Sequence, residues 1–507
     1  MSNLFEACLG DKTGGDKAEG ARLALEAPGG ARLTYGALIE ETGRMANALT
    51  ALGVRPGDRV AVQVEKSARN LILYLASLRM GAVYLPLNTA YTLTELDYFI
   101  GDAEPALVVC DPAAKAGVEA LAAKVGAAVA TLDGVGEGSL ADLARGQPPE
   151  FATADLAGDA LAAIVYTSGT TGRSKGAMLS HDNLASNART LVGAWRFTAD
   201  DVLIHALPIY HVHGLFVAIN VLLMAGGTML FLPGFDADAI VRLMPRATSL
   251  MGVPTFYTRL LKHPGLTRDA TATMRLFVSG SAPLLAETHR EWKDRTGHAI
   301  LERYGMTETG MNVSNPYDGE RRAGTVGFPL PGVEIRVADP ETGAALPPGQ
   351  IGMIEVRGPN VFSGYWRMPD KTAQEFRPDG FFITGDLGVI DQDGYVSIVG
   401  RGKDMVITGG LNVYPIEVEA LIDALPGVVE SAVVGLPHAD FGEAVTAVVA
   451  TGGKPAPSEA EVLAALQDQL AAFKRPKRVL FVDELPRNTM GKVQKAALRE
   501  RFAGLYA

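Results

Sequence analysis

The sequence predicts an α/β fold with a large amino-terminal domain built on parallel sheets and a small α+β domain at the carboxyl end. Short apolar segments of strand length alternate with helix-length amphipathic segments over residues 33–109, which is the order that builds a parallel sheet. The same alternation resumes over residues 202–279. After Gly324 the pattern changes to short alternating strands separated by Gly and Pro turns, which indicates a barrel-like β subdomain over residues 324–400.

The first part of the chain supplies the predicted parallel strands and their crossover helices. Apolar residues at helical spacing mark the helices, and short continuous apolar runs between turn residues mark buried strands. The expected elements are helix 35–52, strand 59–63, helix 70–81, strand 161–165, strand 202–205, helix 213–225, strand 228–232 and strand 276–279. Residues 113–158 are rich in Ala and Gly and carry no motif, so we expect a peripheral helix and a connector there.

The second part of the chain supplies the β subdomain and a carboxyl-terminal domain. The expected elements are strands 334–337, 352–357 and 395–399, then helix 415–424, strands 428–435 and 444–450, and helix 458–472. Glycines at both ends of segment 400–410 indicate a flexible joint. We therefore divide the chain into an amino-terminal domain of residues 1–403 and a mobile carboxyl-terminal domain of residues 404–507.

Length, charge and cysteine content restrict the class of protein. A chain of 507 residues is too long for one compact core. The formal net charge of −11 argues against a general nucleic-acid or anionic-membrane surface, so cationic contacts with an anionic ligand must be local. Cys8 and Cys110 lie far apart without C-x-x-C spacing, which argues against a disulfide framework or a thiolate metal site. No secretory signal or membrane-spanning run is visible, so we expect a protein of the cytoplasm or of an organelle matrix, and assign it to the cytoplasm.

Residues 166–181, YTSGTTGRSKGAMLSH, predict a loop that binds phosphate. The apolar run 161–165 reads as a buried strand that leads into the loop, and residues 180–183 supply caps for a helix that runs to about residue 195. Glycines allow tight turns that point backbone amides inward, while hydroxyls and one ammonium add further donors. The candidate donors are Thr167, Ser168, Gly169, Thr170, Thr171, Gly172, Ser174 and Lys175. The implied ligand is a nucleoside triphosphate.

Three other interpretations of residues 166–181 fit the sequence less well. A Walker P-loop requires Gly-Lys followed by Ser or Thr, but Lys175 is followed by Gly176. The surroundings of Ser174 fit the G-x-S-x-G nucleophile elbow, yet an elbow needs a strand that runs directly into the serine. A solubilising surface loop is the third, but a loop between a buried strand and a capped helix is usually functional.

With four further motifs, this loop resembles the motif series of the adenylate-forming acyl-CoA synthetases. The further motifs are YGMTE at 304–308, TGD at 384–386, GRGKD at 400–404 and PRNTMGK at 486–492. They follow the order of that family, and the resemblance covers residues 35–495. It implies a two-step ligase that uses ATP, Mg²⁺ and coenzyme A. A carboxylate attacks the α-phosphate of ATP to give an acyl-adenylate and pyrophosphate, and coenzyme A then displaces AMP.

The resemblance implies a role for each motif. The loop would hold the β- and γ-phosphates, Glu308 and Thr170 would help to bind Mg²⁺, and Lys492 would bridge the substrate carboxylate and the α-phosphate. Tyr304 would stack on adenine, Asp386 would accept hydrogen bonds from the ribose hydroxyls, and Arg401 would support the ribose or a phosphate. The other implied positions are Glu302, Gly305, Met306 and Thr307 for ATP, Gly409 and Gly410 beside the path of the coenzyme A thiol, and Asp404 as the hinge.

Arg259 distinguishes this chain from relatives that need an apolar acyl pocket. It follows the segment Gly-Val-Pro-Thr at 252–255, and an arginine fork suits a second carboxylate. The combination resembles the malonyl-CoA synthetases, in which the matching arginine, serine and histidine hold the distal carboxylate of malonate. Arg259 and Ser281 would then be anchors, assisted by His211 or His213, which are also candidate catalytic residues.

Two further features of this pocket were considered. Val212 and Met306 would lie near the α-carbon and decide whether methylmalonate fits, because small differences in pocket volume separate substrates only weakly. His211 and His213 could instead bind a metal, but two histidines without a third ligand seldom make a site.

Other functions remain open at this point. The same fold could activate another short-chain or aryl acid, or serve a carrier protein as a stand-alone adenylation domain. A nucleotide sensor without turnover is disfavoured because Lys175, Glu308, Asp386, Arg401 and Lys492 are all present. We also consider a lysine acetyltransferase as a regulatory partner, since acetylation would remove the charge of Lys492.

Overall fold

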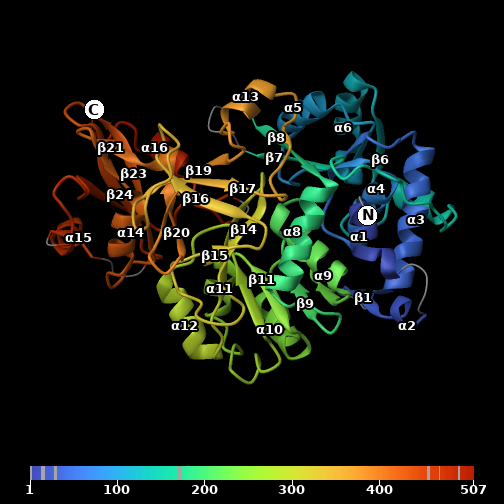
Figure 1. Ribbon diagram of the computed structural model, residues 1–507, viewed down its shortest axis with the longest axis horizontal. Helices are drawn as coiled ribbons and strands as arrows, with labels where there is room; N and C mark the ends of the chain where they lie inside the picture. Colours follow the sequence, from blue (N-terminus) through green and yellow to red (C-terminus); the bar gives the residue numbers. More distant parts are fainter. Residues whose placement is uncertain are drawn as a thin grey trace. The chain divides into compact units, whose positions relative to one another are not determined.

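The computed structural model describes residues 3–12, 17–27, 31–167, 174–453, 457–467, 469–488 and 491–506 (Figure 1). The chain divides into two compact units. Unit 1 comprises Met1–Glu334 and Arg357–Gly380, and unit 2 comprises Ile335–Val356 and Phe381–Ala507. The predicted domain boundary at residue 404 falls within unit 2 and stays a prediction.

The first sheet of unit 1 leads into the predicted phosphate loop. Its strand order in the described chain is β18-β8-β7-β4-β3-β5-β6. The strands are β3 (Arg59–Gln63), β4 (Val83–Pro86), β5 (Leu107–Cys110), β6 (Ala128–Thr131), β7 (Leu161–Thr167), β8 (Lys175–Ser180) and β18 (Gly364–Tyr365). Strands β3 to β7 pair in parallel, whereas β8 and β18 add to the edge in antiparallel pairs.

The second sheet of unit 1 has the order β15-β14-β13-β12-β11-β9-β10-β1-β2 over the residues described. Its strands are β1 (Leu23–Glu26), β2 (Arg32–Thr34), β9 (Val202–His205), β10 (Thr228–Phe231), β11 (Ser249–Gly252), β12 (Leu276–Ser279), β13 (Leu301–Met306), β14 (Gly310–Ser314) and β15 (Phe328–Pro329). Strands β1, β10, β9, β11, β12 and β13 are parallel, so their carboxyl ends lie at one edge. Open parallel sheets bind their ligands at that edge.

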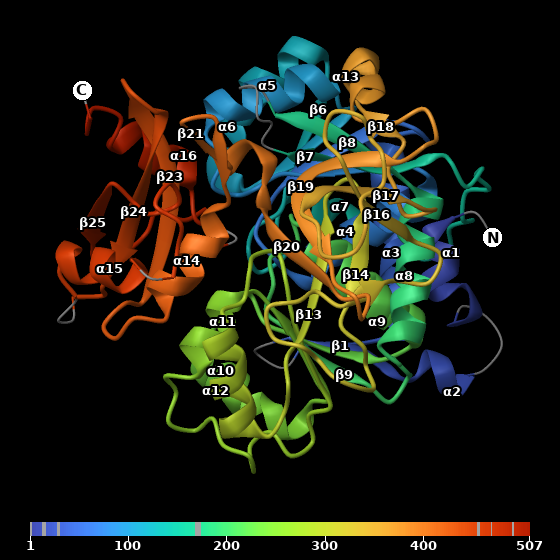
Figure 2. The ribbon, with the colours of Figure 1, turned by 60° about the vertical axis from the view of Figure 1, so that its left-hand side comes forward.

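Helices connect and cover these strands. They are α1 (Leu4–Leu9), α2 (Lys17–Gly20), α3 (Tyr35–Ala51), α4 (Ala68–Met80), α5 (Leu93–Ala103), α6 (Lys115–Ala122), α7 (Ser139–Arg145), α8 (His181–Ala194), the π-helix His213–Ile219, α9 (Asn220–Ala225), α10 (Ala237–Leu243), α11 (Pro254–Leu260), α12 (Ala286–Thr296) and α13 (Pro369–Gln374). Helix α8 packs beside α9 (Figure 1), and α5 packs beside α6 (Figure 2). Within the described residues, no helix is both long and apolar enough to cross a membrane.

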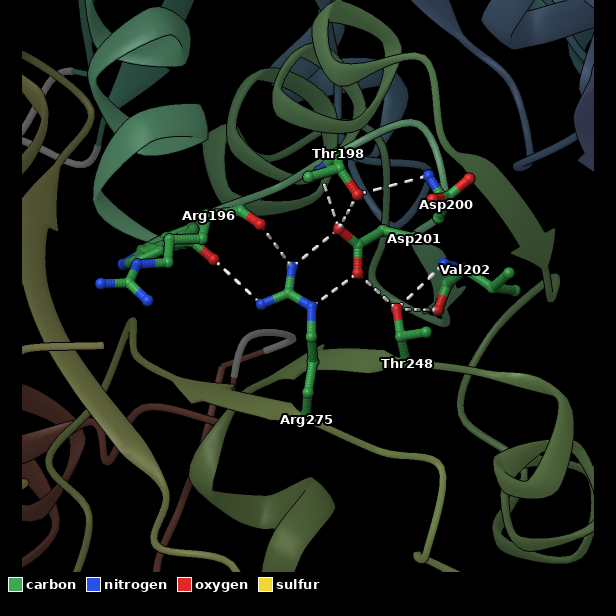
Figure 3. A network of polar contacts seen from close by, with 8 residues as sticks. Arg196, Thr198, Asp200, Asp201, Val202, Thr248 and Arg275 are labelled. Atoms are coloured by element: carbon green, nitrogen blue, oxygen red, sulfur yellow. Dashed lines mark hydrogen bonds and ion pairs between the residues drawn. The ribbon is translucent and has the colours of Figure 1, made fainter. Parts of the chain in front are cut away.

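The amino ends of three parallel strands are joined by a partly buried ion pair (Figure 3). Arg275, just before β12, donates from Nε to Oδ1 of Asp201 at 2.7 Å and from Nη2 to Oδ2 at 2.8 Å. Thr248, just before β11, donates to Oδ1 of Asp201 at 2.7 Å, and Asp201 itself precedes β9. Burial raises the pKa of Asp201, but the bonds from Arg275 and Thr248 outweigh it, so the pKa lies below 3.8. These bonds fix the strands whose opposite ends carry the candidate site.

Unit 2 is built mainly from two sheets. The first has the order β16-β17-β19-β20, with β16 (Glu334–Ala338), β17 (Gly352–Arg357), β19 (Phe382–Ile390) and β20 (Val396–Arg401). The second contains β21 (Val406–Thr408), β22 (Leu411–Val413), β23 (Glu430–His438), β24 (Gly442–Ala450) and β25 (Arg478–Val482). Helices α14 (Pro415–Asp423), α15 (Glu459–Leu466) and α16 (Lys495–Arg501) complete the unit. Fully buried valines such as Val433 and Val445 form the core of the second sheet.

The structure differs from the sequence interpretation at several elements. Lys175 begins a strand, β8, that pairs antiparallel with β7, so a strand rather than the expected loop precedes helix α8. Strand β6 lies within the region that carried no motif, and it pairs in parallel with β5. Helix α15 ends at Leu466, well before residue 472. The predicted caps of α8 are confirmed, because Ser180 and Asn183 form a capping box.

Candidate active site

The described ends of the predicted phosphate loop lie beside Glu308. Thr167 ends β7 and pairs in register with Lys175, the first residue of β8. Its Oγ1 donates to Oε1 of Glu308 at 3.3 Å. Glu308 is buried, and burial raises its pKa above 4.5. Five candidates lie outside the described residues, and their contacts stay predictions: Ser168, Gly169, Thr170, Thr171 and Gly172.

Lys175 has a carboxylate partner that the sequence analysis did not identify. Its buried Nζ donates to Oε1 of Glu375 at 2.9 Å and lies 4.1 Å from the centroid of the Tyr365 ring. The hydroxyl of Tyr365 donates to Oε2 of Glu375 at 2.6 Å, and Nζ of Lys371 lies 2.9 Å from Oε1 of the same carboxylate. Burial raises the pKa of Glu375, but bonds from Tyr365, Lys175 and Lys371 lower it below 4.5. Glu375 was missed because it belongs to none of the motifs.

Glu308 and its neighbours fit a magnesium ion that arrives with a nucleotide. The hydroxyl oxygen of Tyr365 lies 3.1 Å from Oε1 of Glu308 and also contacts Glu375, so it lies between two carboxylates. In the part of the chain that the structure describes, no group of three His, Cys, Asp or Glu side chains could hold a metal. Mg²⁺ usually takes one or two protein carboxylates and completes its coordination with phosphates and water. The donor set therefore suits Mg²⁺ carried by a triphosphate.

The carboxyl ends of β12 and β13 bring together three polar side chains. Ser281 Oγ lies 3.3 Å from Nδ1 of His213, which is fully buried at the start of the π-helix. Ser281 has φ of 71°, a left-handed conformation that non-glycine residues rarely adopt and that is common at functional sites. Arg303 lies on the adjacent strand β13 and is only 4% exposed.

Arg303 carries a positive charge with incomplete hydrogen bonding. Its buried Nε and Nη2 have no hydrogen-bond partner among the described residues. Burial lowers its pKa to about 9, so the group is still charged at neutral pH. A Cβ at position 280 would lie 2.3 Å from Cζ of Arg303, so any larger residue there would require the guanidinium to move. A buried cation of this kind favours an anionic ligand.

Arg303 follows Glu302 directly but was not among the predicted site residues. The available signal was a cation directly before the YGMTE motif, but strand β13 itself was not predicted. Arg259, the predicted anchor, lies on α11 and is exposed, with Cζ 5.5 Å from the centroid of the Phe235 ring. None of the hydrogen bonds or ion pairs found in the described residues joins Arg259 to Ser281 or His213, so its anchoring role stays a prediction.

The remaining candidates of β13 and its turn have local partners. Glu302 is buried, with Oε1 at 3.3 Å from Nδ1 of His289, and burial raises its pKa above 4.5. Tyr304 is buried, and Gly305 approaches Gly310 so closely that a Cβ would lie 2.0 Å from its carbonyl oxygen. Met306 ends β13 and pairs in register with Gly310. Thr307 and Val212 line a common cavity of about 10 Å³, which has room for one water.

The side chain of His211 contacts the backbone of His213. Its Nδ1 accepts a hydrogen bond from the backbone N–H of His213 at 3.3 Å. Burial lowers the pKa of His213 well below 6.5, with nearby Arg303 adding to the shift, so its imidazole is neutral at neutral pH. The structure shows His213 in contact with Ser281.

The other candidates belong to unit 2. Asp386 and Arg401 are cross-strand partners on β19 and β20, with Nε 3.1 Å from Oδ1. Asp404 accepts from Arg499 at 2.8 Å. Gly409 and Gly410, with φ of 58° and 79°, form the turn between β21 and β22. The backbone N–H of Lys492 donates to Oδ1 of Asn488 at 3.0 Å. The predicted roles of these residues toward ATP, coenzyme A and the hinge stay predictions.

Comparison with known proteins establishes the family. Residues 16–366 match the AMP-binding enzyme family, and residues 417–492 match the AMP-binding enzyme C-terminal domain. The chain belongs to the AMP-binding enzymes. The predicted resemblance and the mixed α/β architecture are thereby confirmed. An AMP-binding enzyme of known structure, ATP-bound MatB from Rhodopseudomonas palustris, is 65% identical and has a TM-score of 0.97, with 100% of both chains covered.

Other AMP-binding enzymes of similar sequence differ in the acid that they are named for. A malonate–CoA ligase of Arabidopsis thaliana is 36% identical over 481 residues, which cover 88% of this chain and 78% of that protein. A feruloyl-CoA synthase of an Amycolatopsis species is 37% identical over 478 residues, which cover 94% and 95%. Membership of the family therefore leaves the acid to be decided by the site.

Proposed function

We propose that this AMP-binding enzyme is an AMP-forming malonate–CoA ligase that also accepts methylmalonate. It joins malonate to coenzyme A through a malonyl-adenylate and releases pyrophosphate and AMP. The observation that carries the choice of acid is Arg303, a buried guanidinium beside Gly280 whose Nε and Nη2 have no hydrogen-bond partner among the described residues. It is supported by the polar pair of Ser281 and His213.

The chemistry of the acid explains why this cation matters. A monocarboxylic acid presents its only carboxylate to the α-phosphate and leaves a second cation unpaired. A dicarboxylic acid such as malonate places one carboxylate at the reaction and offers the other to the buried guanidinium. Charge-assisted hydrogen bonds of this type are about twice as strong as neutral ones. Arg259, on α11 after the carboxyl end of β11, is the proposed second cation.

The first chemical step brings two anions together, so it depends on neutralisation and alignment. Lys175 would bind the terminal phosphates, and Lys492 would bridge the attacking carboxylate and the α-phosphate. Mg²⁺ held by Glu308 and the nucleotide would lower the phosphate charge. Asp386 would accept hydrogen bonds from the ribose hydroxyls, because an ionised carboxylate only accepts. Coenzyme A is the acceptor of the second step.

The decisive experiment compares acids. The purified protein is incubated with ATP, Mg²⁺, coenzyme A and one of malonate, methylmalonate, acetate or ferulate, and the thioester is identified by mass spectrometry. We expect malonyl-CoA to form with the highest kcat/KM and methylmalonyl-CoA to follow. Preferential formation of acetyl-CoA or feruloyl-CoA would reject the assignment of the acid, and transfer to a carrier protein alone would reject coenzyme A as acceptor.

Two further inferences concern the setting of the enzyme. We infer a cytoplasmic location, which cell fractionation would test. We also retain Lys492 as a target of a lysine acetyltransferase, because loss of its charge would switch off adenylate formation. Mass spectra of active and inactive pools that show no modification at Lys492 would dispose of that regulation.

A further inference from the structure

A buried lysine lies at the carboxyl end of β3, outside every motif described above. Lys66 is 7% exposed and occupies the connection between β3 and α4. Its Nζ lies 2.8 Å from Nδ1 of His205 and 2.8 Å from the carbonyl oxygen of the same residue. It also lies 4.3 Å from the centroid of the Phe231 ring. His205 and Phe231 end β9 and β10, so Lys66 connects the two sheets of unit 1 at their carboxyl ends.

The surroundings of Lys66 make its presence costly. Burial lowers its pKa well below 10.5, and no carboxylate among the described residues contributes to the opposite shift. An apolar side chain of similar length would fill the same space without the cost of desolvating an amine. Its two contacts to His205 are therefore the most direct reason for a lysine at this position.

His205 links Lys66 to segment 206–214, which contains His211 and His213. Its Nε2 lies 2.8 Å from the carbonyl oxygen of Gly214, which can only accept, so Nε2 carries the hydrogen and Nδ1 is the acceptor for Lys66. Burial, with Lys66 adding to it, lowers the pKa of His205 well below 6.5 and keeps the ring neutral.

The hydrogen bond from His205 to Gly214 joins the two residues that flank segment 206–213. Gly214 follows His213 directly in the π-helix, and a Cβ at position 214 would lie 2.0 Å from the carbonyl oxygen of Pro208. The backbone N–H of Leu215 donates to the carbonyl oxygen of His211 at 2.9 Å. The position of Gly214 therefore sets the position of His213 against Ser281. Short π-helical segments are frequent at functional sites.

We propose that Lys66 is a positioning residue for the acid-binding site. By donating to both the ring and the carbonyl group of His205, it holds the imidazole in the one orientation that bonds to Gly214 and so places His213 beside Ser281. A flipped ring would present a C–H to the carbonyl oxygen of Gly214 and release the segment. Lys66 touches no substrate group in this scheme. The proposal rests on the proposed function for the location of the acid, but its contacts do not depend on which acid is bound.

The kinetic test is Lys66→Met, which removes the amine and keeps the length of the side chain. We expect the KM for the acid to rise about tenfold, while the KM for ATP stays within about twofold, because misplacement of a binding group by a fraction of an ångström is costly. The assay uses whichever acid the wild-type enzyme activates best. The matched control is Lys12→Met. The side chain of Lys12 is 9% exposed, lies over the Tyr35 ring and donates a hydrogen bond to the carbonyl oxygen of Cys8. This substitution should change neither KM.

A spectroscopic test on the unmodified protein covers the case in which Lys66→Met fails to fold. Nitrogen-15 spectra of the full chain labelled at histidine report which ring nitrogen carries hydrogen, and His205→Gln identifies the signal. We expect the Nε2–H form at neutral pH. The Nδ1–H form, or a KM that rises equally for acid and ATP in Lys66→Met, would overturn the proposal. Neither result would bear on whether malonate is the substrate, which the comparison of acids decides.

Discussion

The ammonium group of Lys175 lies 2.9 Å from the carboxylate of Glu375, and both side chains are largely buried. The cation at the end of the predicted phosphate loop is therefore paired within the protein. In the proposed function, a phosphate that binds Lys175 would have to displace this carboxylate or share the ammonium with it. Glu375 would then oppose ATP binding while it keeps a buried lysine paired.

Replacement of this carboxylate should strengthen nucleotide binding. In Glu375→Gln the amide keeps the shape of the side chain and removes its charge. We expect the KM for ATP to fall by about fivefold, the equivalent of about 1 kcal/mol for a partly buried ion pair. Steady-state kinetics at saturating acid and coenzyme A measure this change. Glu334→Gln is the control, because Glu334 pairs with Arg357 at the surface. A higher KM for ATP in Glu375→Gln would show that the carboxylate assists the nucleotide.

Loss of the buried guanidinium should affect the dicarboxylic acid selectively. In Arg303→Met we expect the KM for malonate to rise about a hundredfold, because the distal carboxylate loses a charge-assisted contact worth up to about 3 kcal/mol. Weak turnover of acetate, which has no distal carboxylate, should change little. Arg259→Leu should also raise the KM for malonate far more than the KM for ATP. The control is Arg79→Met, since Arg79 is also buried but bonds the carbonyl oxygens of Ile39 and Phe151. An equal loss of activity with malonate and with acetate would show that Arg303 does not bind the distal carboxylate.

Lys492 should be required for only one half-reaction. Its backbone is held by Asn488, and its side chain is predicted to neutralise the approach of carboxylate to α-phosphate. In Lys492→Ala we expect adenylate formation, followed as pyrophosphate release, to fall by at least about a hundredfold. Thioester formation from a supplied acyl-adenylate should persist near the wild-type rate. Similar losses in both assays would contradict this division of roles.

The sequence predicted the parts of this site that lie in short motifs and missed those that depend on contacts between distant segments. Strand β3 and the caps of α8 follow from local patterns, and β12 was likewise placed from its apolar run. Glu375 lies 200 positions from Lys175, so no local pattern could pair them. Arg303 directly precedes a recognised motif, but its burial depends on how β12 and β13 pack. Strand β8 was hidden because its glycine and lysine weaken the strand pattern.

The ion pair at the opposite ends of the strands should stabilise unit 1 in a pH-dependent way (Figure 3). Asp201→Asn leaves Arg275 partly buried without its counter-ion, which we expect to lower the free energy of unfolding by about 3 kcal/mol at neutral pH. Asp200→Asn is the control, because the side chain of Asp200 is 95% exposed. Urea unfolding of both variants and the wild type measures the difference.

The sign of the pH dependence follows from the lowered pKa of Asp201. Because the folded-state pKa lies below 3.8, the carboxylate contributes its full stability above the pKa of the unfolded chain, about 3.9, and loses it as the pH falls through the folded value. Asparagine does not titrate. The difference in unfolding free energy between wild type and Asp201→Asn should therefore be constant from neutral pH to about pH 5 and shrink below about pH 4. A difference that grows on acidification would show that Asp201 is not ionised in the folded protein.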